Sequence, residues 1–164
     1  MLALALAAAL VAPDAVQLPP NVTVASRLLV IVTDAIRASP TLREQFVRIG
    51  RNRWIRVHLD IDAAERQSGV LFSRAHTDIK RFQYGLIVAA VHLVSTNHAA
   101  ELIAHELEHV HEFAEGTNYR AEAARLPRRV WQTGPNTFES ARALQIERIV
   151  AAEIAGAVAV ANRD

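Results

Sequence analysis

Apolar residues recur every three or four positions near both ends of the chain, whereas the middle third alternates with a period of two. The first spacing is typical of amphipathic helices, and the second is typical of strands with one buried face. The pattern predicts helices over 22–36 and 42–49, strands over 54–61, 69–74 and 82–93, and helices over 97–115, 118–126 and 137–160. This order favours an α+β fold with an N-terminal helix, a small, mostly antiparallel sheet, a long central helix and a C-terminal helix.

Helix start and stop signals support these boundaries. Ser39 or Thr41 is a suitable N-cap for the second helix. Thr96 or Asn97 is a suitable N-cap for the long helix, and Gly116 ends it.

The chain starts with an uncharged, apolar run, Met1–Ala12. A membrane-spanning helix needs about 20 residues, so the run is too short to be a stable span. It matches the apolar region of a secretory signal peptide, although the first basic residue, Arg27, comes only later. We therefore expect either export, to the periplasm or beyond, or a cytoplasmic location. Three prolines between residues 13 and 20 indicate a linker, which gives an N-terminal segment 1–21 and one domain, 22–164.

Composition narrows the classes of function. The chain has 164 residues, of which 51% are apolar and none is cysteine, so disulfides and thiolate metal ligands are excluded. Its 18 basic and 17 acidic residues give a formal net charge of +1. Such a balance provides no overall attraction to nucleic acid, and we expect no nucleic-acid partner.

The long helix carries the candidate chemistry. His105 and His109 are four residues apart, which places both imidazoles on one helical face, one turn apart, where they can share a metal ion. Glu106 follows the first histidine, as in the His-Glu-x-x-His pattern of zinc hydrolases. In such sites Zn²⁺ lowers the pKa of a bound water and a neighbouring glutamate accepts its proton. The pattern therefore predicts a zinc site with Glu106 as the general base.

The same five residues also contain the inverted pattern His-x-x-Glu-His, in which Glu108 would be the base. Only 55 residues follow His109, which is short for the distant third ligand of inverted enzymes, so we favour Glu106. Glu108 is then interpreted as a surface residue or as a contact behind the ligands.

A catalytic zinc site needs a third protein ligand and an open position. The candidates after the motif are His111, Glu112, Glu115, Glu122, Glu139 and Glu147. We favour Glu139, which lies 30 residues after His109 and is predicted in the first turn of the last helix, because that helix can pack back on the first. Glu122 is the alternative third ligand.

Three segments carry a family resemblance. SPTLREQF (Ser39–Phe46), ELIAHELEHVHEF (Glu101–Phe113) and TFESARAL (Thr137–Leu144) resemble, in this order, a group of small bacterial zincin-like proteins. The layout is similar to that of the gluzincin clan of zinc metallopeptidases, especially its minimal single-domain members.

The resemblance implies Zn²⁺ as cofactor, His105, His109 and Glu139 as ligands, and Glu106 as general base. It implies a peptide or protein substrate, which would pair by β-addition with the strand predicted over 82–93. The implied function is a zinc-dependent hydrolase, and the alternative is a zincin-like metal-binding or interaction module without turnover.

The sequence departs from the gluzincin pattern at two places. Many gluzincins have an aspartate four residues after the ligand glutamate, where this chain has Ala143. A residue that would stabilise an oxyanion is also not marked by spacing, and the candidates are His92, Tyr119 and Arg120.

Overall fold

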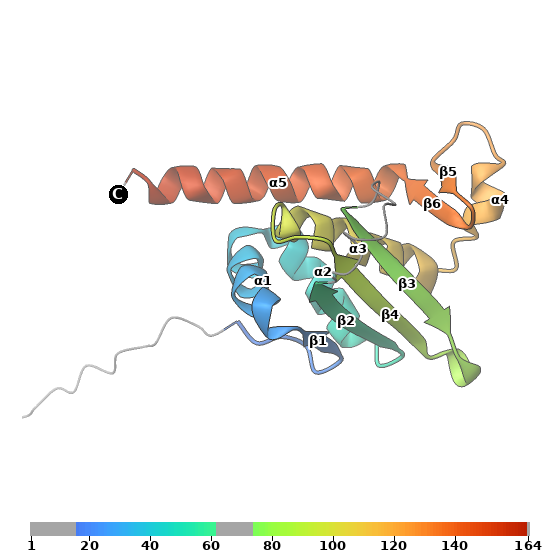
Figure 1. The fold of residues 1–164 in the computed structure, drawn as a ribbon, viewed down its shortest axis with the longest axis horizontal. Helices are drawn as coiled ribbons and strands as arrows, with labels where there is room; N and C mark the ends of the chain where they lie inside the picture. Colours follow the sequence, from blue (N-terminus) through green and yellow to red (C-terminus); the bar gives the residue numbers. More distant parts are fainter. Residues whose placement is uncertain (1–15, 62–73, 164) are drawn as a thin grey trace, which may run out of the picture.

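The structure, a computed structural model, describes residues 16–61 and 74–163 and confirms an α+β fold (Figure 1). The strands of the main sheet are β1 (Val22–Val24), β2 (Ile55–Ile61), β3 (Ala75–Arg81) and β4 (Ile87–Leu93), and β5 (Val130–Gly134) and β6 (Thr137–Ser140) form a hairpin. The helices are α1 (Ser26–Ala38), α2 (Pro40–Arg51), α3 (Ala99–Ala114), α4 (Tyr119–Ala123) and α5 (Ala141–Ala161), with a 3-10 turn, η2 (Gln83–Gly85).

The main sheet is mixed, and the prediction that it is mostly antiparallel is wrong. Its strand order is β1-β2-β4-β3, with β1 and β4 both parallel to β2 and only β3 antiparallel to β4. After β2, the next strand in the chain, β3, lies at the far edge of the sheet. The strand after it, β4, lies between β2 and β3. Alternation of apolar residues shows which face of a strand is buried but carries no information on strand direction, so the pattern could not reveal this crossover.

Several predicted boundaries also shift. Residues 22–24 form β1, so the first helix starts at Ser26, and the long helix starts after His98 in place of Thr96 or Asn97. Of the strand predicted over 69–74, residues 69–73 lie outside the described residues. The next strand, β3, follows Arg74. The beginning of the strand predicted over 82–93 is the turn around η2, where Tyr84 and Gly85 have positive φ angles.

The folded unit includes part of the segment predicted as a linker. Val16 and Leu18 pack against the core, and the Asn21 side chain donates hydrogen bonds to the carbonyls of Ile49 and Ile55. The apolar run Met1–Ala12 lies outside the described residues, so the expectation of export stays a prediction. None of the helices in the described ranges is long and apolar enough to cross a membrane.

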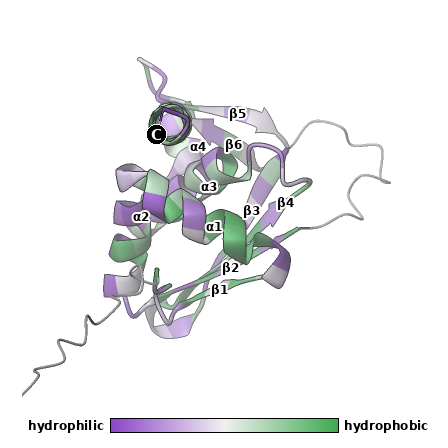
Figure 2. Ribbon diagram, turned by 90° about the vertical axis from the view of Figure 1, so that its left-hand side faces the viewer, coloured by the Kyte–Doolittle hydropathy of each residue, from purple (hydrophilic) through white to green (hydrophobic). Residues whose placement is uncertain are grey.

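The central helix is α3. It packs against β3 and β4 on one side and against α5 on the other (Figure 1). Figure 2 shows α1, α2, α3 and α5 on the same side of the four-stranded sheet. Because α3 is enclosed in this way, twelve of its sixteen side chains are buried, including the polar residues His105, Glu106 and Glu108. A helix buried on almost all sides holds its ionisable groups in fixed positions, since each must find a partner away from water.

A carboxylate on α5 fixes that helix to the start of α2. Ser39 is the N-cap of α2, as predicted, and its hydroxyl accepts a hydrogen bond from the Leu42 N–H at 3.0 Å. The Ser39 hydroxyl also donates to the Glu153 carboxylate, which accepts from the Thr41 hydroxyl at 2.8 Å and from the Thr41 N–H at 3.2 Å. Burial would raise the pKa of Glu153, but these hydrogen bonds lower it below its usual value.

We expect Glu153→Gln to lower the free energy of unfolding by about 1–2 kcal/mol, because a charge-assisted cap is lost. The pKa of Glu153 is lowered in the folded state. Its contribution to the free energy of unfolding is therefore complete above the ordinary glutamate pKa and is lost as the pH falls through the lowered pKa of the folded state. Urea unfolding at pH 7 and pH 4 measures both effects. Glu44→Gln, an exposed position on α2, is the control and should change stability little.

Candidate metal centre

The two histidines of the motif and Glu139 lie together. The ring centroids of His105 and His109 are 5.0 Å apart, with the rings nearly perpendicular. The Nε2 atom of His105 is 3.3 Å from Oε2 of Glu139, and the Nε2 atom of His109 is 3.5 Å from Oε1 of the same carboxylate. One ligand atom from each residue lies within 4.8 Å of the other two. The structure therefore brings together the three residues that the sequence predicted as ligands.

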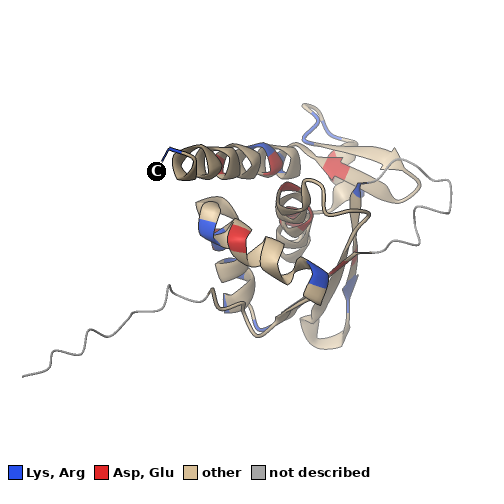
Figure 3. Cartoon of the chain, turned by 60° about the vertical axis from the view of Figure 1, so that its left-hand side comes forward, with Lys and Arg blue, Asp and Glu red and all other residues tan. Residues whose placement is uncertain are grey.

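Glu139 reaches this position from a strand. It is in β6, opposite Trp131 of β5, and Ser140 is the N-cap of α5, accepting from the Ala143 N–H at 3.0 Å. The prediction that Glu139 lies in the first helical turn is therefore wrong, because the helix begins only at Ala141. Extended backbone at β6 and the cap that follows direct the carboxylate toward α3. Figure 3 shows acidic positions on α3, α5 and the hairpin where these elements meet.

Glu106 is buried beside the histidines, and its position is fixed by the sheet. Its Oε2 atom accepts a hydrogen bond of 2.7 Å from the Thr77 hydroxyl on β3. Burial would lower the pKa of His105 and His109, but the pKa of both is raised, mainly by hydrogen bonds to neighbouring carboxylates and to a smaller extent by the charge of Glu106. Thr77 was not identified from the sequence, because no motif relates an edge-strand threonine to the long helix.

A carboxylate faces the second ring nitrogen of each histidine. Nδ1 of His105 is 2.9 Å from Oε2 of Glu147, and Nδ1 of His109 is 3.2 Å from Oε2 of Glu112. Both glutamates had been considered as third ligands, but they occupy the side of the rings away from Glu139. Partners at Nδ1 fix the tautomer that leaves Nε2 for a metal.

Glu147, and not a residue at position 143, is the α5 carboxylate that contacts the His105 ring. It is one helical turn further along α5, and residues four apart share a helical face. Ala143 itself is fully buried. The i, i+4 relation to Ala143 was the signal in the sequence that could have identified Glu147 as the partner of His105.

Burial and the facing carboxylates shift the pKa values of this group in opposite directions. Burial would lower the pKa of His109, but hydrogen bonds to Glu112 and Glu139 raise it to about 9. Burial would raise the pKa of Glu139, but hydrogen bonds from His105 and His109 lower it to about 2. A metal bound here would have to displace the proton that the raised pKa keeps on His109, so its binding would release protons.

Glu108 belongs to a different buried group. It is 1% exposed, pairs with the Arg142 guanidinium of α5 and accepts a hydrogen bond of 2.8 Å from Nε2 of Gln45 on α2. Its interpretation as a surface residue is wrong, because α2 and α5 cover this flank of α3. The carboxylate faces away from the histidine pair, so the inverted pattern gains no support from the geometry.

Two other candidate third ligands have different partners. Glu122, the alternative third ligand, forms an ion pair with Arg125 three residues further on. Glu115 forms ion pairs with Arg48 and Arg142 at the end of α3. Neither belongs to the group around Glu139 in the described part of the chain.

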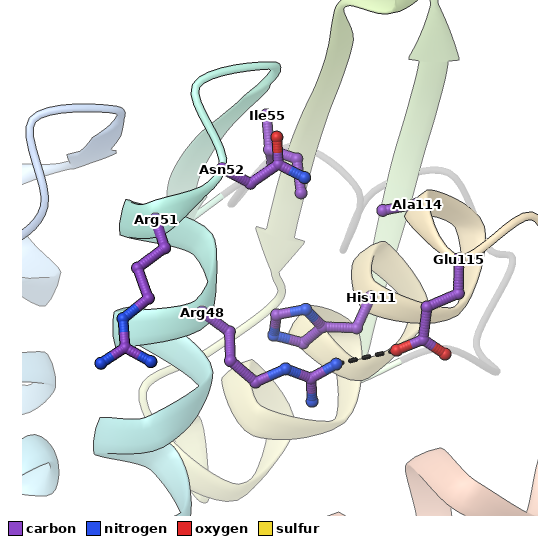
Figure 4. A pocket seen from close by; sticks show the side chains of 7 residues that line it. All are labelled: Arg48, Arg51, Asn52, Ile55, His111, Ala114 and Glu115. Atoms are coloured by element: carbon purple, nitrogen blue, oxygen red, sulfur yellow. Dashed lines mark hydrogen bonds and ion pairs between the residues drawn. The ribbon is translucent and has the colours of Figure 1, made fainter.

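His111, also considered as a ligand, points into a cleft on another side of α3 (Figure 4). The cleft has a volume of about 310 Å³ and lies between the end of α2 and the end of α3, with the Arg48–Glu115 ion pair on its wall. Burial, with Arg48 and Arg142 nearby, lowers the pKa of His111 to about 4. His111 is therefore a neutral, buried histidine that lies outside the candidate metal group.

The predicted candidates for oxyanion stabilisation have other contacts. The Tyr119 hydroxyl lies 3.1 Å from both the His109 carbonyl and Oε2 of Glu112, behind the ligand ring. Arg120 donates to the Asn136 side chain at 2.9 Å. His92 lies in register with His76, on the face of the sheet opposite Val91 and the core.

The prediction for β-addition also needs correction. β4 pairs with β2 on one side and β3 on the other, so it cannot accept another strand. β3 is the edge strand of the sheet and is the one that contacts Glu106.

A comparison of the chain with protein-family models, with curated proteins and with solved structures finds no match.

Proposed function

We propose that this protein is a zinc-dependent hydrolase that cleaves peptide bonds. The observation that carries the proposal is the convergence of His105 Nε2, His109 Nε2 and the Glu139 carboxylate, with the buried Glu106 next to His105 on α3. The family resemblance in the sequence points to the same class of enzyme, and membership of that family is itself part of the proposal.

The donor set fits Zn²⁺. Two imidazoles and one carboxylate are the ligands of many catalytic zinc sites, and three protein ligands leave a position open for water and substrate. The side chains of the three ligands are 9%, 12% and 21% exposed, so the centre is enclosed but still reachable from solvent. When bound, Zn²⁺ would lower the pKa of a water and polarise the substrate carbonyl.

Residues of the chain then perform the proton transfers. Glu106 accepts a proton from the attacking water and donates it to the leaving amine. The Thr77 hydroxyl donates to Oε2 of Glu106, which fixes the position of this carboxylate. Glu147 and Glu112 hold the imidazoles in place.

The edge strand β3 is the proposed binding site for the substrate backbone. Among the described strands none pairs with the outer edge of β3, and an edge strand can bind an extended peptide by β-addition. Because β3 also carries Thr77, a peptide aligned on this strand passes close to Glu106.

A metal-binding module without turnover is the second candidate. The ligands connect α3 to the β5–β6 hairpin, and a metal there would hold these elements together even if nothing is cleaved.

The test is hydrolysis of a degenerate peptide library by protein purified without a histidine tag. We expect cleavage that is lost on chelation and restored by one equivalent of zinc at the α3 centre. Glu101→Gln, on the same helix, serves as the control and should cleave like wild type. Zinc binding at His105, His109 and Glu139 without cleavage of any library member would contradict the hydrolase and favour the module.

A further inference from the structure

A second group of metal-ligating side chains lies on the opposite face of the sheet. His76 and Asp78 of β3 and His92 of β4 each offer a ligand atom within 4.8 Å of the other two. The His76 and His92 rings stack, with centroids 4.9 Å apart and an angle of 25° between their planes. None of the three residues belongs to the α3 centre.

The antiparallel ladder between β3 and β4 fixes this arrangement. His76 is directly opposite His92, so their side chains emerge from the same face as neighbours. Asp78 is two residues from His76, and the period of two places it on the same face, diagonal to His92. Backbone pairing therefore places the three side chains next to one another before any ion binds, which lowers the conformational cost of binding.

A second carboxylate lies near the group, on a face that also carries Lys80 two residues after Asp78. Asp60 of β2 is the register partner of His92 on its other side, so a second carboxylate lies in the same row of the sheet. Asp60 is 3.9 Å from the imidazole of His58, which lies two residues earlier on the same face. This outer face is directed away from the helices, and His76 and His92 are half-buried, so an ion can reach them.

We propose that His76, Asp78 and His92 form a second binding site for a divalent transition-metal ion. Imidazole nitrogens suit zinc, copper and nickel, and one carboxylate completes a three-ligand set of the kind that zinc accepts. The site is independent of the proposed hydrolase activity, because it shares no residue with the α3 centre.

Occupancy of this site would stabilise the strand that carries Thr77. His76 and Asp78 flank Thr77 in the sequence, and Thr77 points to the other face, where it donates to Glu106. An ion held by these two residues and by His92 would connect the edge strand β3 to β4. The metal would therefore restrain the backbone on both sides of Thr77.

Zinc titration of the metal-free protein, purified without a tag and followed by calorimetry, tests the site. We expect wild type to bind one equivalent more than His92→Ala and one more than Asp78→Asn. His58→Ala, a histidine on the same face, is the matched control and should keep the wild-type stoichiometry. The comparison measures a difference of one equivalent whether or not the α3 centre binds zinc.

Hydrogen exchange supplies a second readout. Zinc should slow amide exchange across Ala75–Arg81 by at least about threefold in wild type and His58→Ala, and not in His92→Ala. Equal zinc stoichiometry in wild type, His92→Ala and Asp78→Asn would overturn the proposal. Loss of the same equivalent in His58→Ala would overturn the assigned ligand set.

Discussion

Replacing Glu106 with glutamine should lower kcat for peptide hydrolysis by about a thousandfold, while the zinc content of the α3 centre stays unchanged. General acid–base catalysis contributes on the order of 10²–10⁴ in rate, and glutamine cannot accept the proton. Glutamine keeps the shape of the side chain, and its amide oxygen can still accept the hydrogen bond from Thr77. Steady-state kinetics together with metal analysis measure the two effects separately.

The same change at Glu101 is the control for Glu106→Gln. Glu101 is in the first turn of α3 and contacts His98, so its neutralisation should leave kcat within about twofold of wild type. Hydrolysis by Glu106→Gln at the wild-type rate would show that Glu106 is not the general base.

Arg142→Met should lower the free energy of unfolding by about 3 kcal/mol. Arg142 is the cationic partner of the buried Glu108, which would keep only the hydrogen bond from Gln45, and Arg142 also pairs with the more exposed Glu115. Removing one member of a buried ion pair costs about 3–5 kcal/mol, and the low end is expected because the Arg142 side chain is 41% exposed. Urea unfolding in the presence of a chelator measures this term without a contribution from metal.

Two further variants make this prediction specific. Arg148→Met removes an arginine elsewhere on α5 and should change stability by less than about 0.5 kcal/mol. Combining Glu108→Gln with Arg142→Met should cost less than the sum of the single changes, because the two residues interact. Additive losses, or a loss below about 1 kcal/mol for Arg142→Met, would contradict the assigned ion pair.

The sequence could predict the α3 centre because two of its three residues lie within one turn of the same helix. The i, i+4 spacing of His105 and His109 depends only on helical geometry, and the helix was evident from its apolar period. Glu139 could be anticipated because the segment between the two long helices is short enough to bring its end back to the first. The predicted helix boundary near Glu139 was wrong. Thr137–Ser140 form a short strand whose last residue caps α5, and its residue types are equally common in the first turn of a helix.

The rest of the site depends on tertiary contacts that no local pattern contains. The Thr77 hydroxyl can donate to Glu106 because β3 lies at the edge of the sheet and packs against α3. Burial of Glu108 depends on α2 and α5 both covering one flank of α3. The parallel pairing of β2 with β4 likewise follows from where the chain crosses over, which periodicity does not encode.

The most direct test is an anomalous difference map at the zinc edge from crystals of the zinc-loaded protein. We predict a peak about 2.0–2.2 Å from Nε2 of His105, Nε2 of His109 and a carboxylate oxygen of Glu139, with no fourth protein ligand. No peak between these three side chains in fully loaded crystals would contradict the proposed metal centre and the hydrolase that depends on it.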